Sequence, residues 1–287
     1  MLSVLIVNWN TRDLLRACLL SLRAHPYNGE MEIIVVDNAS TDGSAEMVRT
    51  EFPEVSLVAS QVNTGYAKGN NLAFERATGD LLLTLNPDTE VSGDALDHAA
   101  DALARHPRAG ALGVRLVGTN GRTQSSVRGF PTVLGILGDI LKIRSGPFDS
   151  YRLARFDYEK EGPAPQPMGT FLLFRREALA AIGDPKAPFD EGFPIFFNEV
   201  DLLKRLDNAG WPTIYTPNAS VLHHGGESTK QVRKAMIWES HRSLIRYLKK
   251  HRGTGLGALA LPLVAAAIYG AAFVRARGVH AGFRPQA

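Results

Sequence analysis

The sequence predicts an α/β fold in which helices flank a mostly parallel mixed sheet. Residues 2–7, 33–36 and 81–85 are short, almost continuously apolar runs, which is typical of strands buried on both faces. Segments with helical apolar spacing separate these runs, and residues 12–23 are the first of them. Because strands alternate with helices, we expect βαβ units joined by right-handed crossovers.

The composition is that of an ordinary globular protein. Of the 287 residues, 45% are hydrophobic and 21% are charged, and the formal net charge is +3. Cys18 is the only cysteine in the sequence, so the chain can form neither an internal disulfide nor a cysteine metal site. This cysteine usage, and an N-terminus that runs directly into a strand-like segment without a basic leader, predict a reducing, cytoplasmic location.

The first part of the chain continues the alternation of strands and helices. The further elements expected there are a helix at 44–50, a strand at 55–59, a helix ending at Ala77, a helix at 93–105 and a strand at 111–117. Proline cannot donate to a sheet ladder, so strand 81–85 should end at Asn86-Pro87-Asp88. No Gly-x-Gly-x-x-Gly or phosphate-loop lysine motif follows the first strand, which argues against a dinucleotide dehydrogenase or an NTPase.

Polar clusters follow three of these strands. They comprise residues 37–42, 63–71 and 86–89, which are rich in Asp, Asn and Gly. The carboxyl ends of parallel strands meet at one edge of a sheet, where ligands bind in open α/β folds. Asp88 lies at the end of a central strand, so its carboxylate is placed to hold a divalent metal on a diphosphate. The alternative is an ordinary turn, because Asn, Pro and Asp are all turn formers.

The second part of the chain begins irregularly. Residues 118–165 are rich in glycine and proline, and they predict either a binding loop or an ordinary surface excursion. Regular patterns then return. The expected elements are a strand at 168–175, a helix at 176–182, a helix from the cap residue Asn198 to Leu206, and a strand at 212–215.

Two later features carry groups suited to chemistry. Glu199 and Asp201 fall in the first turn of a helix, where their charges could simply stabilise the helix dipole or could act on a substrate. His223 and His224 stand beside glycines in an expected loop. An imidazole there could ligate a metal or contact phosphate, or it could be purely structural.

The C-terminal region combines a basic helix with an apolar segment. Residues 230–252 carry eight basic side chains and the single acid Glu239. Residues 255–274 contain no charge and are long enough to span a membrane. Pro262 and the basic residues on both sides support a helix that lies in the membrane interface at least as well as they support a span. The alternative is a helix buried at a protein–protein interface. No aromatic stacking pattern accompanies the basic helix, so we expect no nucleic-acid partner.

Together these motifs resemble those of the inverting glycosyltransferases of family 2, which have the Rossmann-like GT-A fold. The bacterial rhamnosyltransferase-like members are the most similar. The resemblance extends over residues 2–250. Its motifs are Val7-Asn8-Trp9-Asn10, residues 37–43, residues 63–71, Asn86-Pro87-Asp88-Thr89, Gly169 with the run to Glu177, Asn198-Glu199-Val200-Asp201-Leu202, and His224 before Gly225 and Ser228.

The resemblance implies a site for a nucleotide-sugar donor, with Asp37 and the main chain near Asn8 at the base and ribose. The donor-binding residues that it implies are Asn8, Asp37, Asn63, Gly65, Lys68, Asn70, Asn86, Asp88 and Gly169. Asp88 corresponds to the metal-binding acid of the family's Asp-x-Asp-like motif, in which Asn86 replaces the first acid. His224 is the candidate second metal ligand, and the implied cofactor is Mg²⁺ or Mn²⁺.

The resemblance also implies a catalytic base. The family shows Glu-Asp-x-Asp before a helix, with the base in the second place, and this chain has Asn198-Glu199-Val200-Asp201. Glu199 therefore takes the place of the base, with Asp201 as the alternative. In an inverting transfer this carboxylate deprotonates the acceptor hydroxyl, while a divalent cation neutralises the diphosphate leaving group.

The implied activity is transfer of rhamnose from dTDP-rhamnose to a lipid-linked or polysaccharide acceptor in cell-envelope glycan synthesis. Residues 1–228 would form the catalytic domain, with a nucleotide-sugar-binding half at 1–117 and an acceptor-binding half at 118–228. Residues 229–287 would associate with the inner leaflet, at the cytoplasmic face of the bacterial plasma membrane. The attachment would be peripheral or an anchor through residues 255–274.

Two alternatives to this activity stay open. One is a catalytically inactive sugar-nucleotide-binding or scaffold protein, because Asn86 and Asn198 stand where the family has acids. The other is a nucleotidyltransferase. That enzyme would need a basic, glycine-rich loop after the first strand, and Thr11-Arg12-Asp13 does not supply one.

Overall fold

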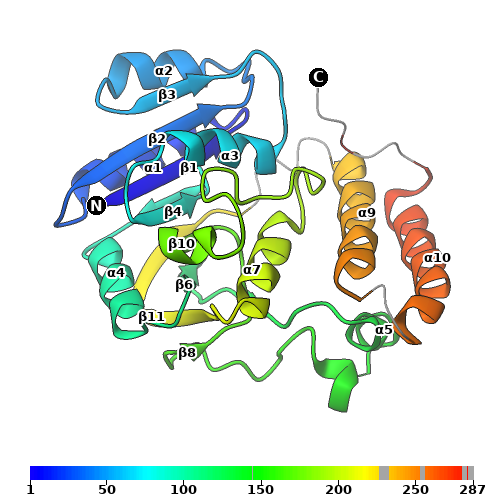
Figure 1. Ribbon diagram of the computed structural model, residues 1–287. Coiled ribbons are helices and arrows are strands. Elements are labelled where there is room, and N and C mark those ends of the chain that lie inside the picture. The colour runs from blue at the N-terminus through cyan, green and yellow to red at the C-terminus, as the bar shows by residue number, and fades with distance from the viewer. Residues whose placement is uncertain (144, 226–232, 253–255, 280–282, 284–287) are drawn as a thin grey trace.

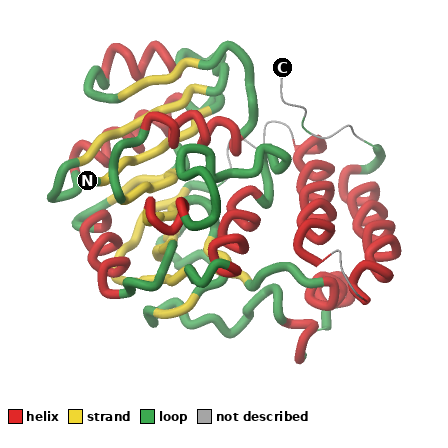
Figure 2. Tube along the Cα trace, in the orientation of Figure 1, coloured by secondary structure: helices red, strands yellow, loops and turns green. Residues whose placement is uncertain are grey.

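The computed structural model describes residues 1–143, 145–225, 233–252, 256–279 and 283 (Figure 1). Nine strands in this part of the chain form one mixed sheet, and helices flank it (Figure 2). The order across the sheet is β3 (Ser56–Ala59), β2 (Met31–Asp37), β1 (Leu2–Asn8), β4 (Leu81–Leu85), β10 (Phe171–Arg175), β6 (Ala111–Val117), β11 (Thr213–His223) and β5 (Thr89–Val91), with β8 (Gly162–Pro163) beside β11.

Most of the strands share one direction. The strands β3, β2, β1 and β4 are parallel, and β11 is parallel to β6. Because β10 is antiparallel to both β4 and β6, the pair β6 and β11 points the same way as β1. Within this nine-stranded sheet, only β10, β5 and β8 run in the opposite direction. The predicted α/β class with a mostly parallel sheet is therefore confirmed.

Helices cover the sheet and extend beyond it. They are α1 (Arg12–Ala24), α2 (Ser44–Glu51), α3 (Tyr66–Arg76), α4 (Ala95–Arg105), α5 (Val133–Leu141), the 3₁₀ helix η1 (Gly146–Asp149), α6 (Arg176–Ala180), α7 (Asn198–Asn208), α9 (Arg233–Arg252) and α10 (Leu256–Ala276). On one face α1, α2 and α4 pack in the same apolar cluster as Val4 and Ile6 of β1. On the other, α3, α6 and α7 pack with Leu5 and Val7. A strand covered on both faces needs an unbroken apolar run, which is what the sequence has.

The irregular segment predicted at 118–165 contains short elements of its own. β7 (Val127–Arg128) pairs with β9 (Gln166–Pro167) in a separate two-stranded sheet, and α5 follows a few residues later. Beyond the sheet, α9 and α10 lie side by side next to α7 (Figure 1). Ile136 of α5, Val200 of α7, Leu248 of α9 and Val264 of α10 belong to one apolar cluster, which joins these helices to the rest of the protein.

The two expected halves of the catalytic region share the sheet. The strand β10 comes from the second half, yet it lies between β4 and β6 of the first half. The carboxyl edge of β4 is therefore close to segments that lie more than 80 residues later in the chain, and Asn86 N donates to the Thr170 carbonyl at 2.9 Å.

The structure corrects the predicted loop around the two histidines. A strand was expected at 212–215 with a loop from Ser220, but β11 continues to His223. Its register against β6 shifts between Thr216 and Ser220, and pairing then resumes through Leu222. The second stretch is held between two neighbours, because Val221 also pairs with β5.

Some sequence expectations concern the C-terminal region. Ser228, the helix start at Lys230 and the segment start at Gly255 lie outside the described residues. None of the helices that the structure describes is both long enough and apolar enough to cross a membrane.

Candidate active site

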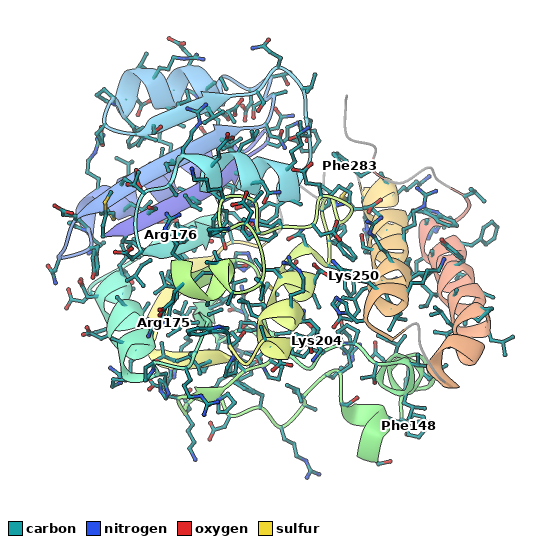
Figure 3. All side chains as sticks on the ribbon, in the orientation of Figure 1. Phe148, Arg175, Arg176, Lys204, Lys250 and Phe283 are labelled. Carbon is teal, nitrogen blue, oxygen red and sulfur yellow. The ribbon has the colours of Figure 1, made fainter. Side chains whose placement is uncertain are left out.

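A cavity of about 640 Å³ opens at the carboxyl ends of β1 and β4, beside the start of α7. Its walls include Trp9 after β1, residues 86–88 after β4, and Glu199 of α7. Phe283, close to the C-terminus, also lines it (Figure 3). Segments that are far apart in the sequence therefore meet at the sheet edge where the polar clusters were predicted to gather.

Asn8 and Asp37 brace the loops behind this cavity. Both side chains are buried, and Asn8 Nδ2 donates to Asp37 Oδ1 at 3.0 Å. The other Asp37 oxygen accepts from Ser40 N at 3.0 Å, and Asn8 Oδ1 accepts from Thr11 Oγ1 at 2.6 Å. These bonds hold the ends of β1 and β2 together, and neither side chain is in the cavity wall.

The next residue, Asn38, does lie in the cavity wall. Its Nδ2 donates to Asn63 Oδ1 and to the Gly65 carbonyl, both at 3.0 Å, and its Oδ1 accepts from Thr64 N at 2.9 Å. These bonds tie the loop after β2 to the loop before α3. Gly65 has a φ of +87°, and a Cβ there would lie 2.8 Å from the Pro194 carbonyl oxygen, so this position requires glycine.

Tyr66 lines the same cavity as Asp88 and Glu199. Its hydroxyl donates to Asn86 Oδ1 at 3.1 Å and lies 3.4 Å from the Gly169 carbonyl oxygen. Burial raises the pKa of the Tyr66 hydroxyl, and the charges of Glu199 and Asp88 raise it further. The hydroxyl therefore keeps its proton and remains a hydrogen-bond donor in the cavity wall.

Asp88 is 5% exposed at the turn after β4. His223 Nε2 lies 3.6 Å from Asp88 Oδ1, and Thr170 Oγ1 lies 3.4 Å from the same nitrogen. A carboxylate oxygen suits Mg²⁺ or Mn²⁺, and imidazole is the commonest nitrogen ligand of metals. Within the described residues, no group of three His, Cys, Asp or Glu gathers that could hold a metal ion by itself.

His224, the residue expected to be the second metal ligand, points elsewhere. Its Nε2 lies 2.7 Å from Glu90 Oε1. His223, by contrast, lines the cavity, and its Nδ1 lies 2.8 Å from Gln124 Oε1. Successive residues of an extended chain point to opposite sides, so only one of two adjacent histidines can face Asp88. Of the two, His223 is therefore the one that faces Asp88, whereas His224 faces Glu90.

Glu199 lines the cavity from the first turn of α7. Gly169 packs directly against it, because a Cβ on Gly169 would lie 3.3 Å from Glu199 Cγ. Burial raises the pKa of Glu199 to about 7. The backbone N–H groups of Glu199 and Val200 favour the carboxylate and so act in the opposite direction. No ion pair to Glu199 occurs among the described residues. A carboxyl with these properties can take a proton near neutral pH, as a general base must.

The helix that carries Glu199 begins after a strained residue. Phe197 is the N-cap of α7 with a φ of +64°, and Asn198 is the first helical residue instead of the expected cap. A left-handed conformation costs a non-glycine residue about 1–2 kcal/mol. The Phe197 ring packs 5.8 Å from the Tyr247 ring of α9, which helps to hold this conformation. The start of α7 is thus fixed by tertiary packing.

Asp201, the alternative base, is turned away from the cavity. Its side chain is fully buried, and both Lys250 Nζ and His251 Nε2 lie 2.8 Å from its Oδ1. Arg205 Nε donates to Oδ2 at 2.9 Å. Burial alone would raise the pKa of Asp201, but these partners lower it to about 2. A carboxylate held in this way is a weak base, so the geometry favours Glu199.

The structure brings together only part of the expected site. The expected residues that line the cavity are Asn63, Gly65, Asn86, Asp88, Gly169 and Glu199. Lys68 is exposed on α3, and Asn70 is buried there with its Nδ2 donating to the Tyr66 carbonyl at 2.9 Å. Asn38 and Tyr66 lie in the wall but were not named as site residues, and His223, considered only as one of the two adjacent histidines, lies there too. All three stand within or beside the motifs, so sequence position was the available signal.

Comparison with known proteins identifies the family. The sequence matches the profile of glycosyl transferase family 2 over residues 3–183. N-acetylglucosaminyl-diphospho-decaprenol L-rhamnosyltransferase of Mycobacterium tuberculosis is 31% identical over 243 residues, which are 78% of this chain and 76% of that protein. The O-antigen biosynthesis protein RfbC of Myxococcus xanthus is 27% identical over 83% of this chain and 18% of its own length.

Solved structures share the fold. The mannosyltransferase PcManGT from Pyrobaculum calidifontis, in complex with GDP-Man and Mn²⁺, superposes with a TM-score of 0.61 at 20% identity, covering 96% of this chain and 74% of that one. TarS 1-349 of Staphylococcus aureus, in complex with UDP-GlcNAc, gives 0.57 at 18% identity, covering 95% and 72%. These are GT-A glycosyltransferases, in agreement with the predicted fold. By sequence and by fold, the chain belongs to glycosyl transferase family 2.

Proposed function

We propose that the protein transfers a sugar from a nucleoside-diphosphate donor to a lipid-linked acceptor, with inversion and with Glu199 as the base. The observation that carries this proposal is the arrangement of Asp88 and Glu199 on one cavity, with the Tyr66 hydroxyl influenced by the charge of both. Transfer requires a place for the donor diphosphate and a base for the acceptor hydroxyl, and these two carboxylates supply them.

In the proposed reaction the chain positions both substrates. Asp88 and His223 would hold a divalent cation, which supplies charge neutralisation for the diphosphate leaving group. Glu199 accepts the proton of the acceptor hydroxyl as that oxygen attacks the anomeric carbon, and Gly169 leaves room for the carboxylate to approach. Tyr66 keeps its proton and orients the loop through Asn86.

We further propose rhamnose, carried by dTDP-rhamnose, as the transferred sugar. The support is the Mycobacterium tuberculosis relative, whose name gives rhamnosyl transfer to a sugar-diphospho-polyprenol. The same relative supports a lipid-linked acceptor over a free polysaccharide. A role in cell-envelope glycan synthesis follows from that acceptor class.

A lipid-linked acceptor implies contact with a membrane, and α10 offers a suitable surface. Leu263 is 79% exposed, Val274 74% and Phe273 52%, although α10 is an apolar helix. Arg275 and Arg277 are exposed at its end. An apolar face beside cationic side chains suits the interface of an anionic bilayer. We propose that the protein lies peripherally on the cytoplasmic leaflet through this face.

The decisive experiment compares the wild type with Glu199→Gln. Product formation from dTDP-rhamnose and a polyprenyl-diphosphate N-acetylglucosaminide should fall at least a hundredfold in the variant, while calorimetric donor affinity stays within about twofold. A variant that retains most of its turnover excludes Glu199 as the base. A wild type that binds donors yet turns over none, with Mg²⁺ or Mn²⁺ present, supports the inactive binding protein instead.

A further inference from the structure

The small β7–β9 ribbon borders the cavity on the side of the 118–165 segment. Arg128 of β7 pairs with Gln166 of β9, and Met168 N donates to the Ser126 carbonyl at 2.8 Å. Met168 then lines the cavity. Arg128 is therefore opposite Gln166, two positions before the cavity-wall residue Met168.

The two faces of this ribbon have different surroundings. Val127 belongs to an apolar cluster with Tyr215, and Pro167 packs on Gly113 of β6, so these residues face the large sheet. Side chains alternate along a strand, and residues directly opposite each other in a pair share a face. Ser126, Arg128, Gln166 and Met168 therefore occupy the other face, the one that includes the cavity wall.

Arg128 differs from every other partly buried arginine that the structure describes. The others bond to carboxylate or carbonyl oxygens, and Arg175 and Arg176 can be followed in Figure 3; they are Arg115, Arg175, Arg176 and Arg205. The Arg128 guanidinium, in contrast, has no hydrogen bond or ion pair within the described residues. Its one close partner is the Tyr151 ring, whose centroid lies 5.8 Å from Cζ.

The same face holds further unsatisfied polar atoms. Ser126 is 4% exposed and Gln166 8%, yet Ser126 Oγ and Gln166 Oε1 have no hydrogen-bond partner in the described part of the protein. Buried polar atoms are normally paired, because leaving one unpaired costs stability. A cation, a hydroxyl and an amide without partners on one face indicate a place for a polar ligand.

Tyr151 connects this face to the catalytic carboxylate. Burial raises the pKa of Tyr151, the charge of Arg128 lowers it, and the charge of Glu199 raises it. Tyr151 also packs against the apolar cluster that contains Val200, the residue after Glu199, so the ring that Arg128 contacts lies next to the start of α7. The acceptor must pass next to Glu199, because its hydroxyl is deprotonated there.

An apolar surface continues from the ribbon. Phe130 packs in the cluster formed by α5, α7, α9 and α10, and α5 packs against α10. Leu134 of α5 and Leu263 of α10 are exposed. A lipid chain that leaves the Arg128 side of the cavity would meet this surface first.

We propose that the ribbon face of Ser126, Arg128 and Gln166 binds the diphosphate of the lipid-linked acceptor, an inference that rests on the proposed function. The planar guanidinium of Arg128 donates paired hydrogen bonds to phosphate oxygens. The Ser126 hydroxyl donates a further one, and Gln166 Oε1 accepts from a hydroxyl of the acceptor sugar. The lipid then leads toward α5 and α10.

The test compares two acceptors in wild type, Arg128→Met and Arg128→Lys. One acceptor is a short-chain polyprenyl-diphosphate N-acetylglucosaminide, and the other is an alkyl N-acetylglucosaminide without phosphate. Arg128→Met should lower kcat/KM for the diphosphate acceptor by about 10- to 100-fold, leave the phosphate-free acceptor within about twofold, and keep the donor KM. Arg128→Lys should recover part of the loss. Arg108→Met, at an exposed arginine after α4, is the matched control.

A binding measurement separates this inference from the proposed base. Acceptor affinity is measured by calorimetry in Glu199→Gln protein and in the double variant with Arg128→Met, with thermal unfolding to verify folding. Weaker diphosphate-acceptor binding at unchanged donor affinity supports the subsite even if Glu199 turns out not to be the base. The inference is overturned if the affinity for both acceptors falls equally, if only the affinity for the donor falls, or if acceptor binding is unchanged.

Discussion

The His251 imidazole of α9 lies 2.8 Å from the Asp201 carboxylate of α7. Lys250, which extends from α9 toward α7 (Figure 3), approaches the same oxygen at 2.8 Å. Asp201 is fully buried, so these contacts are shielded from solvent. Besides the apolar cluster, this carboxylate therefore joins α7 to α9, two residues after the proposed base.

Replacing Asp201 by Asn should destabilise the protein. Removing the carboxylate of this buried cluster leaves His251 and Arg205 without their acidic partner, which costs about 3–5 kcal/mol. The free energy of unfolding in urea measures this. Arg49→Met, at the exposed 3.3 Å pair with Glu46 on α2, should change it by less than about 1 kcal/mol. An Asp201→Asn protein with wild-type stability and no turnover would instead restore Asp201 as a candidate base.

Acid should weaken the same connection. The folded pKa of Asp201 is lowered to about 2, below the ordinary value near 3.9, so the stabilisation is present above pH 4 and is lost as the pH falls toward 2. Its size is about 2 kcal/mol. Unfolding free energies measured between pH 5 and 3 should therefore fall less steeply in Asp201→Asn than in wild type. If the unfolding free energy depends on pH in the same way in both proteins, the stabilisation does not come from Asp201.

The pH dependence of turnover should report Glu199. Its pKa is raised to about 7 by burial, and only the ionised form accepts a proton, so kcat/KM should rise through pH 7 and level off above pH 8. The folded pKa of Glu199 is raised from 4.5 to about 7, so its contribution to stability should decline as the pH rises from about 4.5 to 7 and stay constant above that. Glu177→Gln, at an exposed carboxyl of α6, should keep the rising limb. A flat profile between pH 5 and 8 would exclude this role.

Gly169→Ala should reduce turnover without weakening donor binding. The added methyl would lie 3.3 Å from Glu199 Cγ and would push the carboxylate aside. Small displacements of a catalytic group cost up to about 100-fold in rate, and we expect about tenfold here. Gly162→Ala is the control, because a Cβ at Gly162 meets nothing within 4 Å. Unchanged kcat in Gly169→Ala would show that Glu199 has room to adjust.

Metal dependence should follow His223 and not His224. Dialysis against EDTA should abolish transfer, and Mn²⁺ should restore it in wild type and in His224→Gln, whose imidazole faces Glu90. His223→Gln and Asp88→Asn should require at least tenfold more Mn²⁺ for half-maximal rate. The reverse order of the two histidine variants would return His224 to the metal site.

Membrane binding should depend on the exposed face of α10. Replacing Leu263, Phe273 and Val274 by Ser should reduce co-sedimentation with phosphatidylglycerol vesicles by about tenfold or more, because each removes exposed apolar area. Leu20→Ser, at an exposed leucine of α1, is the matched control. Equal binding by the triple variant would assign the surface to another partner.

The sequence alone determined the sheet edge and the family. Apolar runs such as 81–85 become buried central strands because helices cover both faces, and parallel strands bring their polar ends together. Asn63, Asn86 and Asp88 could therefore be assigned to one edge of the sheet before any coordinates were known, and the family resemblance added Glu199 to that site.

Only the tertiary structure decided which member of each close pair faces the cavity. Glu199 and Asp201 are two residues apart, about 200° around a helix, so they point to nearly opposite sides. His223 and His224 alternate in the same way at the end of β11. The local sequence determines that the two side chains of each pair point to opposite sides. Which of the two faces the cavity depends on how α9 and β5 pack, and that packing depends on contacts between residues distant in the chain. Packing places Glu199 and His223 in the cavity wall, and it places Asp201 and His224 against partners outside that wall.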